Sequence, residues 1–263
     1  MNKIACWNDS HCHLDLEPLC HNLKHFIYNA RSVGVWRILV PGVIGSVRLI
    51  AAPPGVFFAW GVHPAFASTL TASRAGLNSL FQSCTYRPVA IGECGLDKKC
   101  KVPLDLQIAC FRYQAALAQR EGLPLIVHAR GYWQLVQTVL MEEAPGVPWI
   151  FHAYCGSPEL ARQLSVRKGV ISISPPVTKA SAHKYHEVVK VVPIDRFMLE
   201  TDGPDMTPDG WHADFGDSSA IPIVGEKVAD LRNVLVEQIA ALQNANFEGI
   251  FGNLETISGD VLL

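Results

Sequence analysis

The sequence contains little charge and has no excess of either sign. Its 263 residues include 22 Lys and Arg against 24 Asp and Glu, so the formal net charge is −2, and charged residues make up only 17% of the chain. Together with a 49% share of apolar residues, this composition excludes an intrinsically disordered chain. It also excludes a broad basic surface that coats duplex DNA. A phosphate substrate would therefore need local positive charge, from a few side chains or from metal ions.

The sequence also lacks the features of membrane proteins and of zinc-finger or thioredoxin motifs. No run of about 18 or more apolar residues predicts a membrane span, and the opening stretch MNKIACWNDSHCH has no apolar signal-peptide core. Eight cysteines are present, but no two of them form a C-x-x-C pair. We therefore expect a cytoplasmic protein with reduced thiols, no association with membranes and no obligatory protein partner.

Short apolar runs alternate with longer segments of helical period, and no linker or low-complexity tract divides them. The runs are rich in β-branched residues, as expected of strands buried on both faces of a parallel sheet. The eight predicted strands are Ile4–Trp7, Arg37–Pro41, Val56–Gly61, Val89–Gly92, Leu125–Val127, Trp149–Phe151, Val170–Ser174 and Phe197–Glu200. This pattern predicts an α/β fold, one closed (β/α)₈ TIM barrel that forms a single domain over residues 1–263. An open, doubly wound sheet is the alternative.

The segments between the apolar runs predict helices. Leu104, Ile108 and Phe111 follow one another at steps of four and three, which places them on one helical face. Ser157 before Pro158 is typical of an N-cap followed by Pro in the first turn. The predicted helices are Leu104–Arg120, Tyr132–Met141, Pro158–Arg167, Ala180–Val191, a long helix Pro222–Leu242, and Phe251–Gly259.

Polar residues that can bind metal ions follow several of the predicted strands. The segments are Asp9–His13 (DSHCH), Gly61–Pro64 (GVHP), Gly92–Asp97 (GECGLD), Val127–Arg130 (VHAR), Phe151–Tyr154 (FHAY) and Glu200–Pro204 (ETDGP). In a parallel barrel the carboxyl ends of all strands meet at one rim, where the catalytic groups of this fold gather. The sequence thus predicts one site with five imidazoles and two or more carboxylates.

The spacing of these residues suits a metal site. Because residues two apart on a strand point to the same face, His11 and His13 can bind one cation while Cys12 points away. Cys94 is likewise expected to face the packed side of its strand. Imidazole suits zinc, copper, iron or nickel, and carboxylate suits harder ions. Glu93, between two imidazole groups, can bridge two cations about 3.5–4 Å apart, an arrangement that clamps a phosphoryl centre.

Taken in order, these segments resemble the motifs of the TatD-type metal-dependent deoxyribonucleases. The resemblance rests on DSHCHLD at Asp9–Asp15 together with the five later segments, and it extends over nearly the whole chain. LETDGPDM at Leu199–Met206 is especially close to one bacterial subgroup of TatD-like hydrolases. The resemblance implies a TIM barrel of the amidohydrolase type, up to two divalent cations, and 3′→5′ exonuclease activity on DNA.

The resemblance also implies roles for individual residues. The implied metal ligands are His11, His13 and Asp202 for one cation, His128 and His152 for the other, and Glu93 as the bridge between them. His63 would line the pocket and contact the phosphate or the leaving group, and Asp202 would also orient or deprotonate the attacking water. Zinc, magnesium and manganese are all compatible with such a donor set.

Basic and aromatic residues near the predicted rim suggest contacts with a single-stranded or frayed DNA end. The basic residues are Lys98, Lys99, Lys101 and Arg130. A solvated surface cluster is the alternative for the three lysines. The aromatic residues that could stack bases are Phe66, Tyr154 and Trp211. Core packing or loop anchoring is the alternative for each of these rings.

Two other functions are compatible with the same residues. A small-molecule amidohydrolase or esterase would use the same barrel, but many of these enzymes bridge two metals with a carboxylated lysine, so Glu93 favours a phosphodiesterase. A non-catalytic metal-binding subunit that kept the motif is the third possibility. The remaining histidines are His21, His25, His183 and His186, which we expect at the surface, and His212, which is left open.

Overall fold

The computed structural model describes residues 5–43, 53–69, 77, 87–252 and 254 of the chain. Within these residues, eight parallel strands pair in chain order, each with the next. They are β1 (Trp7–Asp9), β2 (Val35–Val43), β3 (Val56–Gly61), β4 (Ala90–Asp97), β5 (Leu125–Arg130), β6 (Trp149–Phe151), β7 (Gly169–Ile173) and β8 (Phe197–Leu199). This arrangement confirms the parallel α/β barrel expected from the sequence.

Backbone contacts just beyond β1 and β8 bring the first and last strands together. The N–H of Asp202 donates a hydrogen bond to the carbonyl of His11 (2.8 Å), and the N–H of His13 donates to the carbonyl of Gly203 (2.7 Å). Cys12 and Gly203 form an isolated parallel bridge at the same place. The barrel is therefore nearly closed, and the segments that join its ends carry predicted site residues.

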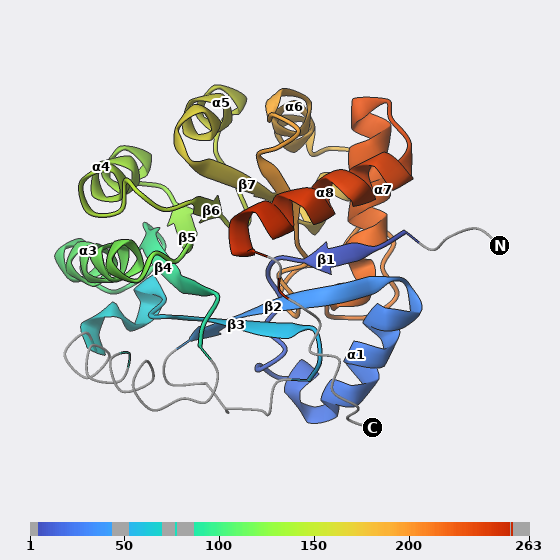
Figure 1. Cartoon of the computed structure of the whole chain (residues 1–263), viewed down its shortest axis with the longest axis horizontal. Helices are drawn as coiled ribbons and strands as arrows, with labels where there is room; N and C mark the ends of the chain where they lie inside the picture. Colours follow the sequence, from blue (N-terminus) through green and yellow to red (C-terminus); the bar gives the residue numbers. More distant parts are fainter. Residues whose placement is uncertain (1–4, 44–52, 70–76, 78–86, 253, 255–263) are drawn as a thin grey trace.

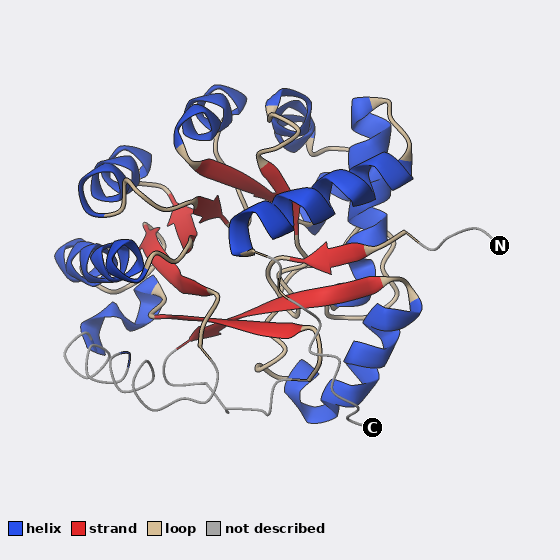
Figure 2. Ribbon diagram, viewed as in Figure 1, coloured by secondary structure: helices blue, strands red, loops and turns tan. Residues whose placement is uncertain are grey.

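Helices surround the strands on the outside of the barrel (Figure 1, Figure 2). They are α1 (Leu23–Ser32), α3 (Leu104–Glu121), α4 (Trp133–Glu143), α5 (Pro158–Arg167), α6 (His183–Val191), α7 (Ile221–Arg232) and α8 (Val236–Phe251). Short 3₁₀ segments span Leu19–Asn22, Pro64–Thr69, Pro175–Thr178 and Ser218–Ala220. Helix α5 begins as predicted, because Ser157 Oγ accepts a hydrogen bond from the N–H of Leu160 and Pro158 follows the cap. Among the described residues, no helix combines the length and the apolar character that crossing a bilayer requires.

Alternate residues of each strand point into the barrel or outward to the helices, as the two-residue period of a strand requires. The inward layer nearest the start of the strands takes one residue from each of β2 to β8. These residues are Leu39, Ala59, Ala90, Ile126, Ile150, Val170 and Met198, and they pack with Phe247 of α8. Their strand neighbours, such as Ile38 and Val127, belong instead to the larger core between strands and helices.

Helix α8 closes the end of the barrel at which the strands begin. It lies against β1 and β8 (Figure 1). Its Asn246 donates a hydrogen bond to the carbonyl of Phe197 at the start of β8 (2.8 Å), and Asn8 in β1 donates to Asn244 (2.6 Å). Phe247 is fully buried within the inward layer. Because this end is covered and apolar, the polar site forms at the opposite end, where the strands finish.

The first strand begins later in the chain than the sequence predicted. The sequence predicted a strand over Ile4–Trp7, whereas β1 begins at Trp7 and Ile4 lies outside the described residues. Asp9 continues the strand because its backbone pairs with Ile38 and its buried carboxylate accepts hydrogen bonds. A charged residue that finds such partners can lie inside a strand, which an apolar pattern does not reveal.

The long helix predicted over Pro222–Leu242 was wrong, because the structure contains two helices there. Helix α7 ends at Arg232 and α8 begins at Val236. Between them, Asn233 adopts a left-handed conformation with φ 54°, and its N–H donates to the carbonyl of Asp230 (3.1 Å). Asn adopts this conformation more readily than most residues and commonly ends helices. The helix predicted over Phe251–Gly259 lies almost entirely outside the described residues.

We predict that Phe247→Ala lowers the free energy of unfolding by about 3–5 kcal/mol, because it removes a fully buried ring and leaves a cavity. Urea denaturation followed by circular dichroism measures this change. Val166→Ala is the control, since Val166 is 86% exposed, and it should change the same quantity by less than about 0.5 kcal/mol. A loss below about 1 kcal/mol for Phe247→Ala would contradict the role of this ring in closing the barrel.

Candidate metal centre

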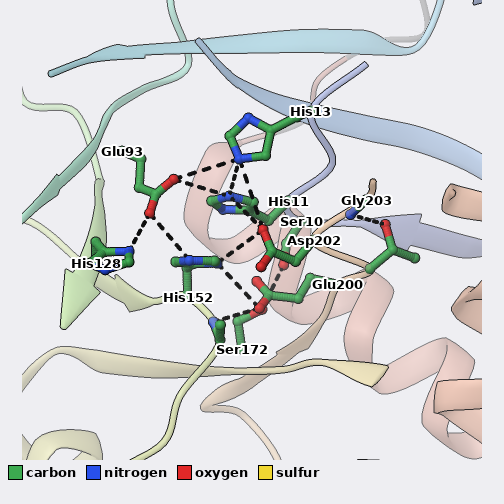
Figure 3. A network of polar contacts seen from close by, with 12 residues as sticks. Ser10, His11, His13, Glu93, His128, His152, Ser172, Glu200, Asp202 and Gly203 are labelled. Carbon is green, nitrogen blue, oxygen red and sulfur yellow. Dashed lines mark hydrogen bonds and ion pairs between the residues drawn. The ribbon is translucent and has the colours of Figure 1, made fainter. Parts of the chain in front are cut away.

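Six side chains expected to bind cations lie together at the carboxyl end of the barrel (Figure 3). His11 and His13 follow β1, Glu93 lies in β4, His128 in β5, His152 follows β6, and Asp202 follows β8. All of them are buried except His128, which is half-buried. The fold thus gathers residues from five separate strand ends into one place.

Glu93 lies inside β4, which is longer than the strand predicted from the sequence. The expected strand was Val89–Gly92, followed by a polar loop, whereas β4 continues to Asp97. Between Ile91 and Cys94, three residue steps on β4 lie opposite two on β5. Such a bulge re-aims side chains, and Glu93 lies within it.

The first donor group consists of His11, His13, Asp202 and the Oε2 atom of Glu93. The Nε2 atoms of the two histidines are 3.3 Å apart, and Glu93 Oε2 lies 3.4 and 3.7 Å from them. Asp202 Oδ1 lies 3.5 and 3.9 Å from the same two nitrogens. Donors that bind a tetrahedral zinc ion at 2.0–2.1 Å are about 3.3 Å from one another. The spacing of this group therefore fits one divalent cation.

The second donor group consists of His128, His152 and the Oε1 atom of Glu93. This oxygen lies 2.6 Å from Nδ1 of His128 and 3.3 Å from Nε2 of His152. Nε2 of His63 lies 3.7 Å from the same oxygen, and His63, Glu93 and His128 offer donor atoms within 4.8 Å of one another. One carboxylate thus contacts both donor groups, as a bridging ligand would.

Burial and mutual contacts set the charge states of these groups. Burial, reinforced by nearby His152, lowers the pKa of His11 to about 4, so its imidazole is neutral at pH 7, the form that binds metals. Burial likewise lowers the pKa of His63 to about 4 and raises that of Asp202 to about 8. Burial alone would raise the pKa of Glu93, but the surrounding imidazoles, His152 foremost, hold it well below its ordinary value. Of the two carboxyl groups among the six predicted ligands, Glu93 is therefore the one that is ionised at pH 7.

Three further buried carboxylates support the centre, and the sequence interpretation assigned them no role: Asp9, Asp97 and Glu200. Asp9 accepts hydrogen bonds from the N–H of His11 (3.1 Å) and from the N–H and hydroxyl of Thr201 (3.0 and 2.5 Å), so it ties together the two segments that close the barrel. Each of the three lies two or four residues from a predicted ligand. This even spacing along the chain from a predicted ligand is the signal that would have found them.

A cavity of about 360 Å³ lies beside the second donor group. Its lining residues are His63, Ala65, Asp97, Lys99, Cys100, Lys101, Val102 and Arg130. Three of the four basic residues expected to hold phosphate therefore line it. Lys98 does not, because its aliphatic carbons lie against Gly131 instead. The cavity thus places positive charge next to His63.

The three aromatic residues considered for base stacking lie in different environments. Tyr154 is buried, and its hydroxyl donates to the carbonyl of Ser157 (2.8 Å). The half-buried Trp211 donates from Nε1 to the carbonyl of Phe215 (2.9 Å), which anchors its loop. Phe66 exposes 48% of its surface. The contacts of Tyr154 and Trp211 match the packing and anchoring alternatives, and Phe66 is the ring with most exposed surface.

The other cysteines and histidines considered above lie apart from the donor groups. Cys12 and Cys94 are fully buried in the core, as predicted. The exposed histidines are His21, His25, His183 and His212. His186 is half-buried at the surface, and its Nε2 lies 2.9 Å from the carbonyl of Val177. The packing of α6 on the neighbouring 3₁₀ segment explains this contact.

A parallel barrel with histidine and carboxylate donors at the carboxyl ends of its strands defines the class of metal-dependent TIM-barrel hydrolases. The chain belongs to the TatD family within this class, because the family model described as TatD related DNase matches residues 8–252. This match confirms the resemblance seen in the motifs.

Individual relatives agree with this assignment. The chain is 36% identical over 251 residues to the uncharacterized metal-dependent hydrolase YabD of Bacillus subtilis, covering 92% of this chain and 98% of that protein. It is similar to the crystal structure of YjjV, a TatD homolog from Escherichia coli, with a TM-score of 0.87 and 26% identity over 95% of this chain and 99% of that one. A TatD family hydrolase from Entamoeba histolytica shares the fold at 17% identity, with a TM-score of 0.81 over 94% of this chain and 99% of that one.

We predict that Zn²⁺ raises the melting temperature of chelator-treated protein, because an ion that binds the folded state alone stabilises it, by about 2.7 kcal/mol at a free concentration 100 times Kd. His11→Ala should reduce this shift. His212→Ala removes an exposed imidazole outside the donor groups and should leave the shift unchanged. Thermal unfolding with and without Zn²⁺ provides the measurement, and equal shifts for His11→Ala and wild type would contradict a cation at the first donor group.

Proposed function

We propose that the protein hydrolyses phosphodiester bonds as a 3′→5′ exonuclease on single-stranded or frayed DNA ends, using one or two divalent cations (zinc, magnesium or manganese). The observation that carries this proposal is the position of Glu93, with one oxygen in each donor group. Sites with two metals about 3.5–4 Å apart serve phosphodiester hydrolysis by stabilising both the attacking and the leaving oxygen. The name of the family, TatD related DNase, supports the same substrate class.

The residues that would hold the cations are His11, His13 and Asp202 on one side, His128 and His152 on the other, and Glu93 between them. When bound, such cations polarise the scissile phosphate and neutralise the charge that develops on it. The contribution of the chain is a buried set of donors, fixed in place before substrate arrives. Their low exposure supports this role because water competes poorly there.

We assign proton transfer to Asp202 and a substrate contact to His63. Asp202 Oδ1 lies at the edge of the first donor group, 3.9 Å from Nδ1 of His152. From this position the ionised carboxylate, which predominates above its pKa of about 8, would orient the attacking water and accept its proton. His63 contacts Glu93 on one side and lines the cavity on the other, where its imidazole would contact the phosphate or the leaving oxygen.

The cationic cavity would hold the DNA strand through its phosphates. Lys99, Lys101 and Arg130 supply positive charge there, while the net charge of −2 gives the protein no general attraction for nucleic acid. Such a small group of positive charges suits the end of a single DNA strand better than a long DNA duplex. We assign Lys98 to the same role, with a smaller contribution because it does not line the cavity.

The direct test is digestion of end-labelled single-stranded and duplex oligonucleotides by the metal-loaded protein, with an aryl phosphodiester and an aryl ester as small substrates. We expect labelled strands to shorten from their 3′ ends and the phosphodiester, but not the ester, to turn over. Turnover of the ester alone would contradict the proposal and favour a small-molecule amidohydrolase. Bound cations without turnover of any substrate would favour a non-catalytic subunit. The cytoplasmic location expected from the sequence stays a prediction.

Glu93→Gln should abolish this turnover, with a loss of at least about 100-fold, because an amide keeps the size of the side chain but loses the charge that both donor groups face. Rates of oligonucleotide digestion, with circular dichroism to verify folding, provide the measurement. Glu226→Gln, at an exposed position of α7, is the matched control and should retain wild-type rates. Full activity in Glu93→Gln would show that the site has been assigned to the wrong residues.

Replacing Lys99 and Lys101 together with Ala should raise KM for a single-stranded oligonucleotide with little change in kcat, because these residues would bind the phosphates in the ground state and transition state alike. The effect should be largest at low salt, and the dependence of log KM on log salt concentration should weaken by roughly 0.7 per lost contact. Lys98→Ala is the comparison and should change KM less. If Lys98→Ala matched or exceeded the double variant, the cavity would not be the phosphate site.

A further inference from the structure

His128 is held between two carboxylates of one strand. Its Nδ1 lies 2.6 Å from Glu93 Oε1, and its Nε2 lies 3.2 Å from Asp97 Oδ2. Gly95, midway between these two residues on β4, pairs with His128, and a Cβ at Gly95 would lie 2.0 Å from the carbonyl oxygen of His128. The Asp97 carboxylate is itself fixed, since Oδ1 accepts a hydrogen bond from the N–H of Lys99 (2.7 Å).

His152 has the same arrangement with its ring nitrogens exchanged. Its Nε2 lies 3.3 Å from Glu93 Oε1, and its Nδ1 lies at ion-pair distance, 3.5 Å, from Glu200 Oε1 (Figure 3). Glu200 is fully buried, and Oε1 accepts a hydrogen bond from the N–H of Ala153 (2.5 Å). The carboxylate is thus attached to the backbone directly after the histidine that it faces. Each histidine of the second donor group therefore has Glu93 on one nitrogen and an outer carboxylate on the other.

The histidines of the first donor group are less supported. Within the described residues, no hydrogen bond reaches Nδ1 of His11 or of His13, and Nδ1 of His152 has ion pairs but no hydrogen bond. Asp15 Oδ1 lies 3.9 Å from Nδ1 of His13, a longer ion pair than the 3.5 Å one between Glu200 and His152. No carboxylate lies at ion-pair distance from Nδ1 of His11 among the described residues. A carboxylate behind a metal-binding imidazole fixes its tautomer and orientation, and its loss costs about 10–100-fold in metal affinity. The two donor groups therefore differ in what holds their imidazoles.

We infer that Asp97 and Glu200 are positioning residues that determine the occupancy of the second donor group, and that the first donor group binds its cation without them. The inference rests on the proposed function, in which His128, His152 and Glu93 bind a cation. Neither carboxylate belongs to the six ligands, and each faces the far nitrogen of one histidine of the second donor group. Glu200 also lies within 4.8 Å of a ring nitrogen of His11, without a hydrogen bond to it. Removing either charge should therefore turn a protein that binds two cations into one that retains a single cation at limiting metal.

Calorimetric titration of Zn²⁺ into the chelator-treated, full-length protein tests this inference. We expect two binding steps in the wild type, of which His128→Ala abolishes the one that belongs to the second donor group. Asp97→Asn and Glu200→Gln keep the size of the side chains and should each weaken that same step by about 10–100-fold, with the other step unchanged. The zinc content after dialysis should fall from two ions per chain towards one in both variants. Excess Zn²⁺ should restore the second ion.

Asp217→Asn is the matched control, because Asp217 is a buried carboxylate that accepts its hydrogen bonds from Ser219. It should leave both binding steps unchanged. Unchanged steps in Asp97→Asn and Glu200→Gln would overturn the inference and leave the proposed function intact. Equal weakening of both steps would also overturn it, because that result indicates a general structural role. Fewer than two steps in the wild type would overturn the inference, because it needs a second cation, while the proposed hydrolysis with one cation would stand.

Discussion

The buried charge of Glu93 is the feature around which the rest of the site is arranged. All five histidines of the predicted site place a ring nitrogen within 3.7 Å of one of its two oxygens. A carboxylate that is only 3% exposed is costly unless it is paired, so this shell of imidazoles stabilises the charge in the absence of other partners. The histidines follow or lie in β1, β3, β5 and β6, and only a ring of parallel strands brings such positions to one point.

One end of the barrel contributes mainly to the stability of the fold, and the other end carries the candidate metal centre. At one end, α8 seals an apolar layer with Phe247, where hydrophobic burial stabilises the fold. At the other end, buried polar groups depend on one another, because Asp9 joins the segments after β1 and β8 while those segments supply His11 and Asp202. Closing the barrel and assembling the first donor group are therefore the same structural event. The second donor group is supported separately, by carboxylates that contact the outer nitrogens of its histidines.

Much of the fold and most of the gathered residues could be predicted from the sequence, because buried strands are apolar and their polar ends mark one rim. The exceptions share a physical cause. The strand β4 was predicted to end at Gly92, since Glu93 and Asp97 are polar, yet inside a barrel the face towards the site is polar as well. The break at Asn233 lies within a continuous helical pattern, so it depends on backbone conformation rather than hydrophobicity. The sequence also did not show that Lys99 and Lys101, but not Lys98, line the cavity. This depends on the path of the loop backbone, which composition does not reveal.

The central claim is that one carboxylate, Glu93, joins two cation sites. The most direct measurement is anomalous X-ray diffraction from crystals of the full chain grown with Zn²⁺. The account predicts two anomalous peaks about 3.5–4 Å apart, one on each side of the Glu93 carboxylate. The first peak should lie against His11 and His13, and the second against His128 and His152. An absence of peaks at Glu93, or zinc bound only by residues outside the two donor groups, would contradict it.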